Sequence, residues 1–244
     1  KENKYDDDIF FQKYSQMSRS QQGLAGAGEW ETLRKLLPDF KDKRVLDLGC
    51  GYGWHCIYAM EHGASSVVGV DISHKMLEVA KEKTHFPQVE YKCCAIEDVE
   101  FPEESFDVIL SSLAFHYVAD YEILVKKIYR ILKSGGKLVF TVEHPVFTAY
   151  GTQDWYYNEK GEILHFPVDN YYYEGKRTAV FLGEKVTKFH RTLTTYLNTL
   201  LSNGFIINHI VEPQPPENMM DIPGMQDEMR RPMMLIVSAN KKVD

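Results

Sequence analysis

Residues 45–53 read VLDLGCGYG, and this stretch decides the fold. Its first four residues have the character of a buried strand, and a turn with three glycines follows. Because glycine has no side chain, Gly49, Gly51 and Gly53 would let the backbone approach a ligand closely. The stretch therefore predicts a strand that leads into a cofactor-binding loop and then into a helix.

An acidic residue follows the next apolar run. Residues 67–70 have the character of a second strand, and Asp71 comes directly after them, about eighteen residues beyond Gly53. A carboxylate at the end of this strand can accept hydrogen bonds from the two hydroxyls of a ribose. The glycine turn and the acid together predict a nucleoside site.

The composition narrows the choice of function. The chain has 244 residues, 44% of them hydrophobic, and a net charge of −7, so it can bury a core but has no basic excess for nucleic acid. No run approaches the roughly 18 apolar residues of a membrane span, and residues 1–8 are too polar for a signal peptide. The four cysteines have neither disulfide nor metal-site spacing. We expect a cytoplasmic protein with reduced thiols and no metal; the oligomeric state stays open.

Strands and helices alternate through the first half of the chain. Strands are predicted at residues 44–48, 67–71, 89–93, 106–111 and 137–142, and helices at 54–61, from Ser73 and at 121–132. This alternation predicts a doubly wound α/β sheet whose ligand lies outside the carboxyl ends of the strands. A helix at 193–201 and strands at 205–211 and 233–239 close the chain, and the long loop between these strands predicts an antiparallel hairpin at the sheet edge.

Two segments fall outside the alternation. Residues 1–40 form a predicted N-terminal helical cap, with helices at 12–19 and 29–37, ahead of a main domain at 41–244. Residues of about 145–189 are rich in tyrosine, tryptophan and phenylalanine, and predict an inserted lid with one or two hairpins. These aromatic side chains could contact a planar acceptor, but in a small insertion they more often form its own core.

Four ordered motifs carry a family resemblance: VLDLGCGYG (45–53), VVGVDIS with KML (67–77), FPEESFDVILSSLAFHYV (101–118) and RILKSGGKLVF (130–140). The sequence resembles the class I S-adenosylmethionine-dependent methyltransferases, and among them the small-molecule methylases of ubiquinone and menaquinone biosynthesis. The resemblance implies a Rossmann-like seven-stranded sheet with an antiparallel last strand, and S-adenosylmethionine as cofactor. It also implies a small-molecule methyl acceptor, with no nucleic-acid or membrane partner.

The resemblance further implies cofactor contacts along the loop and the strand ends, at Asp47, Gly49, Cys50, Gly51, Asp71, Ile72, Met76, Ser111 and Leu113. The family often has an aspartate for the adenine amino group where this chain has Ala95, so Glu97 or the backbone of Ile96 would serve instead. From the cap, Tyr14 and Arg19 could close over the cofactor, although an exposed or structural role fits them nearly as well.

Two histidines are candidate bases. Methyl transfer is an in-line displacement, so much of its rate comes from holding the nucleophile and the methyl group roughly 3–3.5 Å apart in a dry pocket. A hydroxyl or amine acceptor would gain from a base, and histidine suits that role near neutral pH. His116 and His144 follow the fourth and fifth strands on the cofactor side. Each could instead be a polar loop residue that bonds to the backbone.

Three other functions compete with methyl transfer to a small molecule. A nicotinamide dehydrogenase also has a glycine turn, but its fingerprint is GxGxxG, and Asp47 would place negative charge where the diphosphate lies. A nucleic-acid methylase fits poorly with the acidic charge and with SSLA at residues 111–114. We predict methyl transfer from S-adenosylmethionine to an oxygen, nitrogen or carbon of a small molecule. The alternative is a protein that binds this cofactor without methyl transfer.

Overall fold

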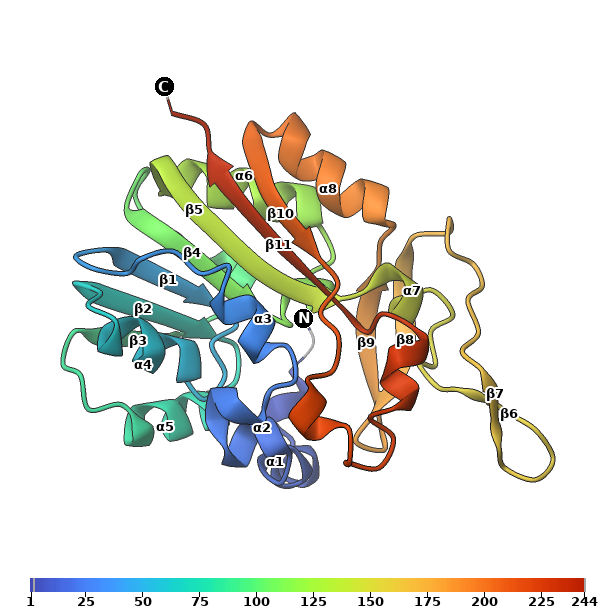
Figure 1. Ribbon diagram of the computed structural model, residues 1–244. Helices are drawn as coiled ribbons and strands as arrows, with labels where there is room; N and C mark the ends of the chain where they lie inside the picture. The colour runs from blue at the N-terminus through green and yellow to red at the C-terminus, as the bar shows by residue number, and fades with distance from the viewer. Residues whose placement is uncertain (2, 244) are drawn as a thin grey trace.

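A seven-stranded sheet forms the centre of the molecule, which the computed structural model describes over residues 1 and 3–243 (Figure 1). Its strands are β1 (Arg44–Leu48), β2 (Ser66–Asp71), β3 (Val89–Cys93), β4 (Phe106–Ser112), β5 (Leu132–Glu143), β10 (Phe205–Val211) and β11 (Met234–Lys241). The spatial order is β10-β11-β5-β4-β1-β2-β3, and β11 runs antiparallel to both of its neighbours. The expected doubly wound sheet with a reversed last strand is confirmed.

Helices cover both faces of this sheet. One face carries α6 (Tyr121–Ile131) and α8 (Leu193–Ser202), and the other carries α3 (Trp30–Arg34), α4 (Trp54–Glu61) and α5 (His74–Lys83). On the first face Leu124 and Leu200 share a core cluster with Phe140, and on the second Trp30 packs in a cluster with Val67. The strands are therefore buried on both sides, which explains their continuous apolar runs.

The fifth strand begins earlier than the sequence predicts. We expected a break at residues 134–136 and a strand at 137–142, but β5 starts at Leu132, directly after α6. Leu132 is fully buried and pairs with Phe106, so the chain turns from helix to strand at that point. The glycines that were expected to break the helix lie within the strand, with a positive φ of 71° at Gly135.

The N-terminal segment contains more helices than expected. The predicted single helix at residues 12–19 is wrong, because the chain forms α1 (Asp8–Ser15) and α2 (Ser18–Gln21). The Asp7 side chain accepts from the first N–H groups of α1, which moves the start of that helix forward. Met17 is extended, with ψ of 149°, and separates the two helices. The short turns η1 (Lys4–Asp6) and η2 (Gly23–Gly26) flank the pair.

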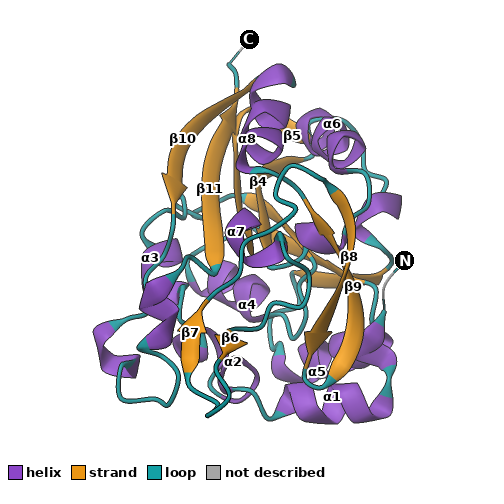
Figure 2. Ribbon diagram, turned by 90° about the vertical axis from the view of Figure 1, so that its right-hand side faces the viewer, coloured by secondary structure: helices purple, strands orange, loops and turns teal. Residues whose placement is uncertain are grey.

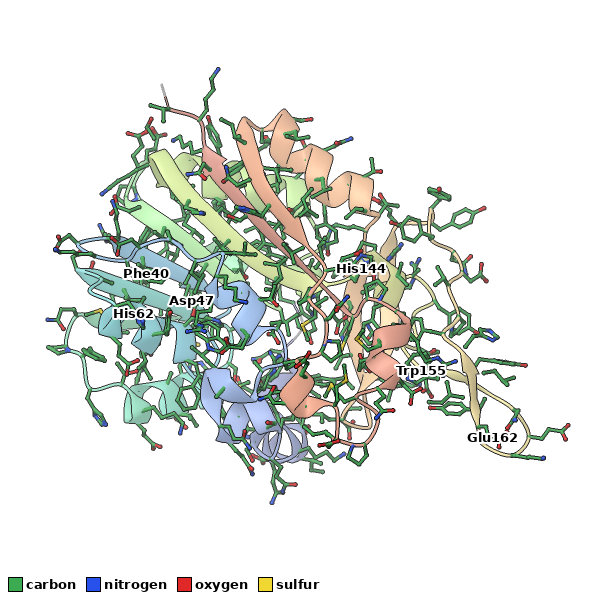
Figure 3. The ribbon with its side chains drawn as sticks, in the orientation of Figure 1. Phe40, Asp47, His62, His144, Trp155 and Glu162 are labelled. Atoms are coloured by element: carbon green, nitrogen blue, oxygen red, sulfur yellow. The ribbon has the colours of Figure 1, made fainter. Side chains whose placement is uncertain are left out.

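The insertion contains two hairpins, as the sequence predicts, and a short helix that was not expected. Its elements are α7 (Pro145–Thr148), β6 (Tyr156–Tyr157), β7 (Ile163–His165), β8 (Gly175–Phe181) and β9 (Glu184–His190). The β6–β7 hairpin projects away from the sheet, with Glu162 at its tip (Figure 3). The β8–β9 hairpin lies beside the N-terminal segment (Figure 2), where Ala179 and Val186 pack on Phe10. The insertion and the cap therefore support each other.

Short 3-10 turns complete the chain: η3 (Ile96–Asp98), η4 (Phe115–Tyr117), η5 (Glu217–Met219) and η6 (Asp227–Arg230). Two of them follow strands, η3 after β3 and η4 after β4, and both contribute residues to the site. All four cysteines are free thiols. No helix within residues 1 and 3–243 is long and apolar enough to span a membrane.

Candidate active site

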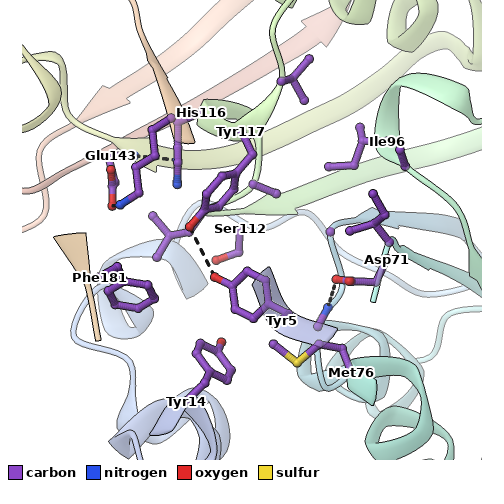
Figure 4. A pocket seen from close by; sticks show the side chains of 18 of the residues that line it. Tyr5, Tyr14, Asp71, Met76, Ile96, Ser112, His116, Tyr117, Glu143 and Phe181 are labelled. Carbon is purple, nitrogen blue, oxygen red and sulfur yellow. Dashed lines mark hydrogen bonds and ion pairs between the residues drawn. The ribbon is translucent and has the colours of Figure 1, made fainter. Parts of the chain in front are cut away.

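A cavity of about 210 Å³ lies at the carboxyl ends of the central strands. The sheet side supplies the glycine turn, Asp71 and the residues that follow β3 and β4. The cap supplies Tyr5 and Tyr14, and the insertion supplies Phe181 and Lys188. Figure 4 shows the cap and insertion residues facing the sheet residues across the cavity. Doubly wound sheets bind ligands at this edge, so the cavity is the candidate active site.

The glycine turn forms one wall of the cavity. The N–H groups of Gly49 and Cys50 both donate to Val70 O, at 2.8 and 2.9 Å, which ties the turn to β2. Gly51 has a positive φ of 51°, and a Cβ placed on it would meet no atom within 4 Å. Its Cα therefore faces open space inside the cavity, which leaves room for a ligand against the backbone.

Asp71 holds the turn from the end of β2. Its Oδ2 accepts from the N–H of Gly51 at 2.9 Å, and its Oδ1 accepts from the N–H of Ser73 at 2.9 Å. Burial raises the pKa of Asp71 above its ordinary value. The cap is fixed beside this carboxylate, because Asp6 Oδ1 accepts from Ser73 Oγ at 2.6 Å and from the N–H of Lys75 at 3.2 Å.

A smaller cavity of about 80 Å³ adjoins the first, between the glycine turn and the cap. Two of its lining side chains, Trp54 and His55, have a buried ring N atom (Nε1 and Nε2) with no hydrogen-bond partner among the described residues. Asp47 lies buried behind the turn, and its Oδ1 also has no partner there. Unpartnered buried polar atoms are costly, so a polar ligand in this cavity could satisfy the ring nitrogens of Trp54 and His55.

Arg19 lines both cavities, but a partner within the protein already holds it. Its Nη2 donates to both carboxylate oxygens of Glu29 at 2.9 Å. Burial disfavours the guanidinium charge, but the Glu29 carboxylate outweighs this and raises the pKa of Arg19 above its ordinary value. The predicted contact of Arg19 with the cofactor carboxylate therefore stays a prediction, and that contact would share the guanidinium with Glu29.

Most of the predicted site residues line the larger cavity: Tyr14, Arg19, Gly49, Gly51, Asp71, Ile72, Met76, Ile96, Glu97, Leu113 and His116. Cys50 lines only the smaller cavity, and Asp47, Ser111 and His144 line neither of them. The structure thus brings most of the expected residues to one cavity, because those on the sheet side follow the strands directly, and their contacts with the cofactor stay predictions.

Ser111 is the residue whose orientation the sequence misassigns. Its Oγ donates to Leu48 O at 2.7 Å, inside the sheet, and the side chain is 3% exposed. Successive side chains of a strand point to opposite faces, so the next residue, Ser112, lines both cavities instead. The contact that the resemblance implies for Ser111 is therefore open to its neighbour Ser112.

His116 faces the larger cavity in a defined protonation state. The side chain is 2% exposed, and burial lowers its pKa to about 4, so the ring is neutral at pH 7. The N–H of Glu143 donates to His116 Nδ1 at 3.3 Å. Because Nδ1 is the acceptor, the single proton of the neutral ring is on Nε2. His116 therefore offers an N–H donor to the cavity, whereas a base at Nε2 would need the other tautomer.

His144 lies outside the cavity, at the start of the insertion (Figure 3). Its Nδ1 accepts from the N–H of Val146 at 3.0 Å and caps α7, and its Nε2 lies 2.7 Å from Glu212 Oε1. Burial lowers its pKa, and Glu212 opposes that shift. Nδ1 is engaged by the backbone and the ring lines neither cavity, so the structure does not place His144 as a base, and the alternative role of a loop residue bonded to backbone describes it.

An ion pair at the end of the cavity was not predicted. Lys188 Nζ lies 2.6 Å from Glu143 Oε1, and both side chains are buried. Burial alone would raise the pKa of Glu143, but the Lys188 ammonium helps to hold it below its ordinary value. The only sequence signal was the place of Glu143 at the end of a strand. Lys188 comes from β9, and its position depends on how the insertion folds over the sheet.

Comparison with known proteins agrees with this geometry. The methyltransferase domain family matches residues 46–140. A structure from Listeria monocytogenes, assigned to the S-adenosylmethionine-dependent methyltransferases, is 58% identical with a TM-score of 0.86, over 90% of this chain and 99% of that chain. The S-adenosylmethionine-dependent methyltransferase of Mesorhizobium loti is 41% identical with a TM-score of 0.82, over 89% of this chain and 100% of that chain.

A third relative matches a shorter part of this chain. The ubiquinone biosynthesis O-methyltransferase of Coxiella burnetii is 36% identical over 112 residues, which are 45% of this chain and 47% of that protein. The Listeria and Mesorhizobium matches extend over nearly the whole of those chains and include the sheet that forms the site. The chain therefore belongs to the family of S-adenosylmethionine-dependent methyltransferases.

Proposed function

We propose that this methyltransferase transfers the methyl group of S-adenosylmethionine to an oxygen, nitrogen or carbon atom of a small molecule. The observation that carries this is the continuity of the larger cavity. It extends from Asp71 and Gly51, where the cofactor is expected, past Ser112 to His116 and Lys188. Donor and acceptor could therefore meet within one cavity. The Coxiella relative, named for a small-molecule substrate, supports the same class of acceptor.

The residues of the cavity suit the donor. S-adenosylmethionine supplies a methyl group on a positively charged sulfur when it is bound. Asp71 would accept hydrogen bonds from the ribose hydroxyls, and Gly51 leaves its backbone open to close approach. The aromatic rings of Tyr5 and Tyr14 exclude water from the centre of the cavity and favour a cation. Asp47, buried behind the turn, adds negative charge on the same side.

The transfer itself needs little from the protein. The nucleophile of the acceptor gives an electron pair to the methyl carbon, the carbon–sulfur bond breaks, and its electron pair stays on sulfur. The products are a thioether and the methylated acceptor, and any proton on the nucleophile leaves to solvent. The cavity contributes by holding the two partners in line and dry, which can account for most of the rate.

Cofactor binding and turnover test this function separately. We expect calorimetry to show binding of both S-adenosylmethionine and S-adenosylhomocysteine. We also expect release of S-adenosylhomocysteine when the enzyme is incubated with a panel of small metabolites. Failure to bind either compound would contradict the proposal. Binding without turnover on any member of a broad panel would favour the alternative, a cofactor-binding protein without methyl transfer.

Asp71→Asn is expected to weaken S-adenosylhomocysteine binding at least tenfold. The amide keeps one acceptor oxygen for the turn but loses the charge that ribose hydroxyls prefer, and hydrogen bonds to charged groups are worth about 1.5–3 kcal/mol. Asp71→Ala is a poorer test, because Asp71 also holds the N–H groups of Gly51 and Ser73. The matched control is Asp221→Asn on an exposed loop. Equal affinity of Asp71→Asn and the control, measured by calorimetry, would remove Asp71 from the ribose.

A further inference from the structure

The end of the cavity opposite Asp71 has a polar composition of its own. Figure 4 shows His116, Glu143 and Phe181 on one side of Tyr5, with Asp71, Ile96 and Met76 on the other. We call the first side the acceptor end and define it by His116, Tyr117, Glu143, Phe181 and Lys188, all of which line the cavity. If the cofactor lies against Asp71, the acceptor end is where the second substrate must bind.

Two hydrogen-bond donors at this end, one on His116 and one on Lys188, are left for a ligand. His116 presents Nε2–H, because its Nδ1 is already the acceptor for the N–H of Glu143. An ammonium has three N–H groups, and Lys188 directs two of them to Glu143 Oε1 at 2.6 Å and Gln153 Oε1 at 2.8 Å. One N–H of Lys188 is left for a ligand.

Each oxygen of the carboxylate at the same end already has a hydrogen-bond partner. Glu143 Oε1 is bound by Lys188, and Glu143 Oε2 accepts from Gln153 Nε2 at 2.5 Å. A cationic acceptor would have to compete for these oxygens with an ammonium that is only 2% exposed. The free polar groups therefore favour an acceptor that brings negative charge or oxygen lone pairs.

Aromatic rings give this end its shape. Lys188 Nζ lies 5.4 Å from the centre of the Phe181 ring and 6.0 Å from that of Tyr117, and the His116 and Tyr117 rings are 4.5 Å apart. Flat ring surfaces pack best against flat ligands. A planar ligand could thus lie between these rings with its charged edge on the donors.

We propose that the methyl acceptor is a small planar organic anion whose charged oxygens accept hydrogen bonds from His116 Nε2 and Lys188 Nζ. This rests on the proposed function, since it assumes that the cofactor occupies the Asp71 end. His116 then acts as a binding and positioning residue that donates a hydrogen bond, and the acceptor arrives in its ionised form.

Three one-ring probes of nearly equal size test the class of acceptor. The wild-type protein is first saturated with S-adenosylhomocysteine, and benzoate, benzyl alcohol and benzylamine are then titrated separately by calorimetry or ligand-observed NMR. We expect benzoate to bind at least tenfold more tightly than the other two. Tighter binding of benzylamine, equal binding of all three, or no binding of benzoate overturns the proposal. Failure at the first step, the binding of S-adenosylhomocysteine, would instead contradict the proposed function.

Two substitutions at one position test the role of His116. Gln has an amide N–H that can take the place of Nε2–H but cannot act as a base near neutral pH, and Phe has no donor at all. We expect His116→Gln to hold benzoate within threefold of wild type and His116→Phe to lose at least tenfold. Unchanged S-adenosylhomocysteine affinity shows that each variant is folded. Equal losses in the two variants, or no loss in His116→Phe, would overturn the assignment of a donor.

Discussion

Gly49→Ala is expected to lower the free energy of unfolding by roughly 3 kcal/mol or more, because the site is both strained and crowded. A Cβ on Gly49 would lie 2.4 Å from the Cβ of Ala114, at a φ of +81°. The left-handed backbone costs about 1–2 kcal/mol for a residue with a side chain, and overpacking adds about 1–3 kcal/mol. Denaturant unfolding followed by circular dichroism measures the loss.

Gly51→Ala, two residues further on, is expected to fold and to lose the cofactor. A Cβ on Gly51 would meet no protein atom within 4 Å, so only the cost of its φ of +51° remains. The added methyl group would, however, occupy the space that faces the cavity. We expect S-adenosylhomocysteine affinity to fall at least tenfold with a loss of stability of about 1–2 kcal/mol.

Gly161→Ala is the matched control for both changes. Gly161 lies at the tip of the β6–β7 hairpin, has a φ of +78°, and also has no atom within 4 Å of an added Cβ. It should show the cost of backbone strain alone, with normal affinity for S-adenosylhomocysteine. If Gly51→Ala bound that ligand as tightly as Gly161→Ala does, the turn would not be the cofactor wall.

The sheet could be predicted from the sequence because its signals are local. The apolar runs, the glycine turn and Ser73 as a helix cap each depend on a few neighbouring residues, and β1 and β3 have the predicted bounds. The closing hairpin could also be predicted, since the long loop before Met234 left no helix for a crossover. Where local signals competed, as between α6 and the early start of β5 at Leu132, burial against Phe106 decided the boundary.

The acceptor side of the site depends on contacts that no local pattern encodes. Tyr5 and Lys188 reach the cavity only because the cap and the β8–β9 hairpin pack together around Phe10. The proton position on His116 is set by the N–H of Glu143, which is distant in sequence. His144, like His116, comes after a central strand, but the start of α7 engages its ring. Sequence position alone could not separate the two histidines.

Asp47→Asn is expected to raise the free energy of unfolding of the cofactor-free protein at pH 8 and to lower its affinity for the cofactor. Asp47 is 1% exposed, its Oδ2 accepts only the weak S–H donor of Cys56 at 3.5 Å, and burial raises its pKa to about 7. The pKa in the unfolded chain is about 3.9. Because the folded pKa is the higher one, the ionised carboxylate opposes folding above pH 4, and the effect is complete above pH 7.

The size of the destabilisation by ionised Asp47 follows from the shift in its pKa. A shift of about three units corresponds to roughly 4 kcal/mol of destabilisation at pH 8. Asn removes the charge but adds an amide N–H without a partner, which costs about 1–3 kcal/mol, so the net gain is roughly 1–3 kcal/mol. At pH 4 the gain should turn into a loss of about 1–3 kcal/mol, because Asp47 is then neutral in the folded protein and only the cost of the unpartnered amide N–H remains. Chemical denaturation at both pH values measures the difference.

Asp107→Asn is a control for which the expected change in stability has the opposite sign. Asp107 accepts a hydrogen bond from the N–H of Arg44 and pairs with Lys133. Burial would raise the pKa of Asp107, but these partners outweigh burial and lower it. The charge of Asp107 therefore stabilises the fold above the pKa of the unfolded chain, and this contribution is lost on acidification. Asp107→Asn should lower stability at pH 8 and leave cofactor affinity unchanged.

Asp47→Asn should instead bind S-adenosylmethionine at least tenfold more weakly, since it removes the negative charge behind the turn that favours a cationic ligand. A fall in stability at pH 8 for Asp47→Asn would mean that the ionised carboxylate is well solvated or paired, and that the cofactor is not the group for which this buried charge is retained.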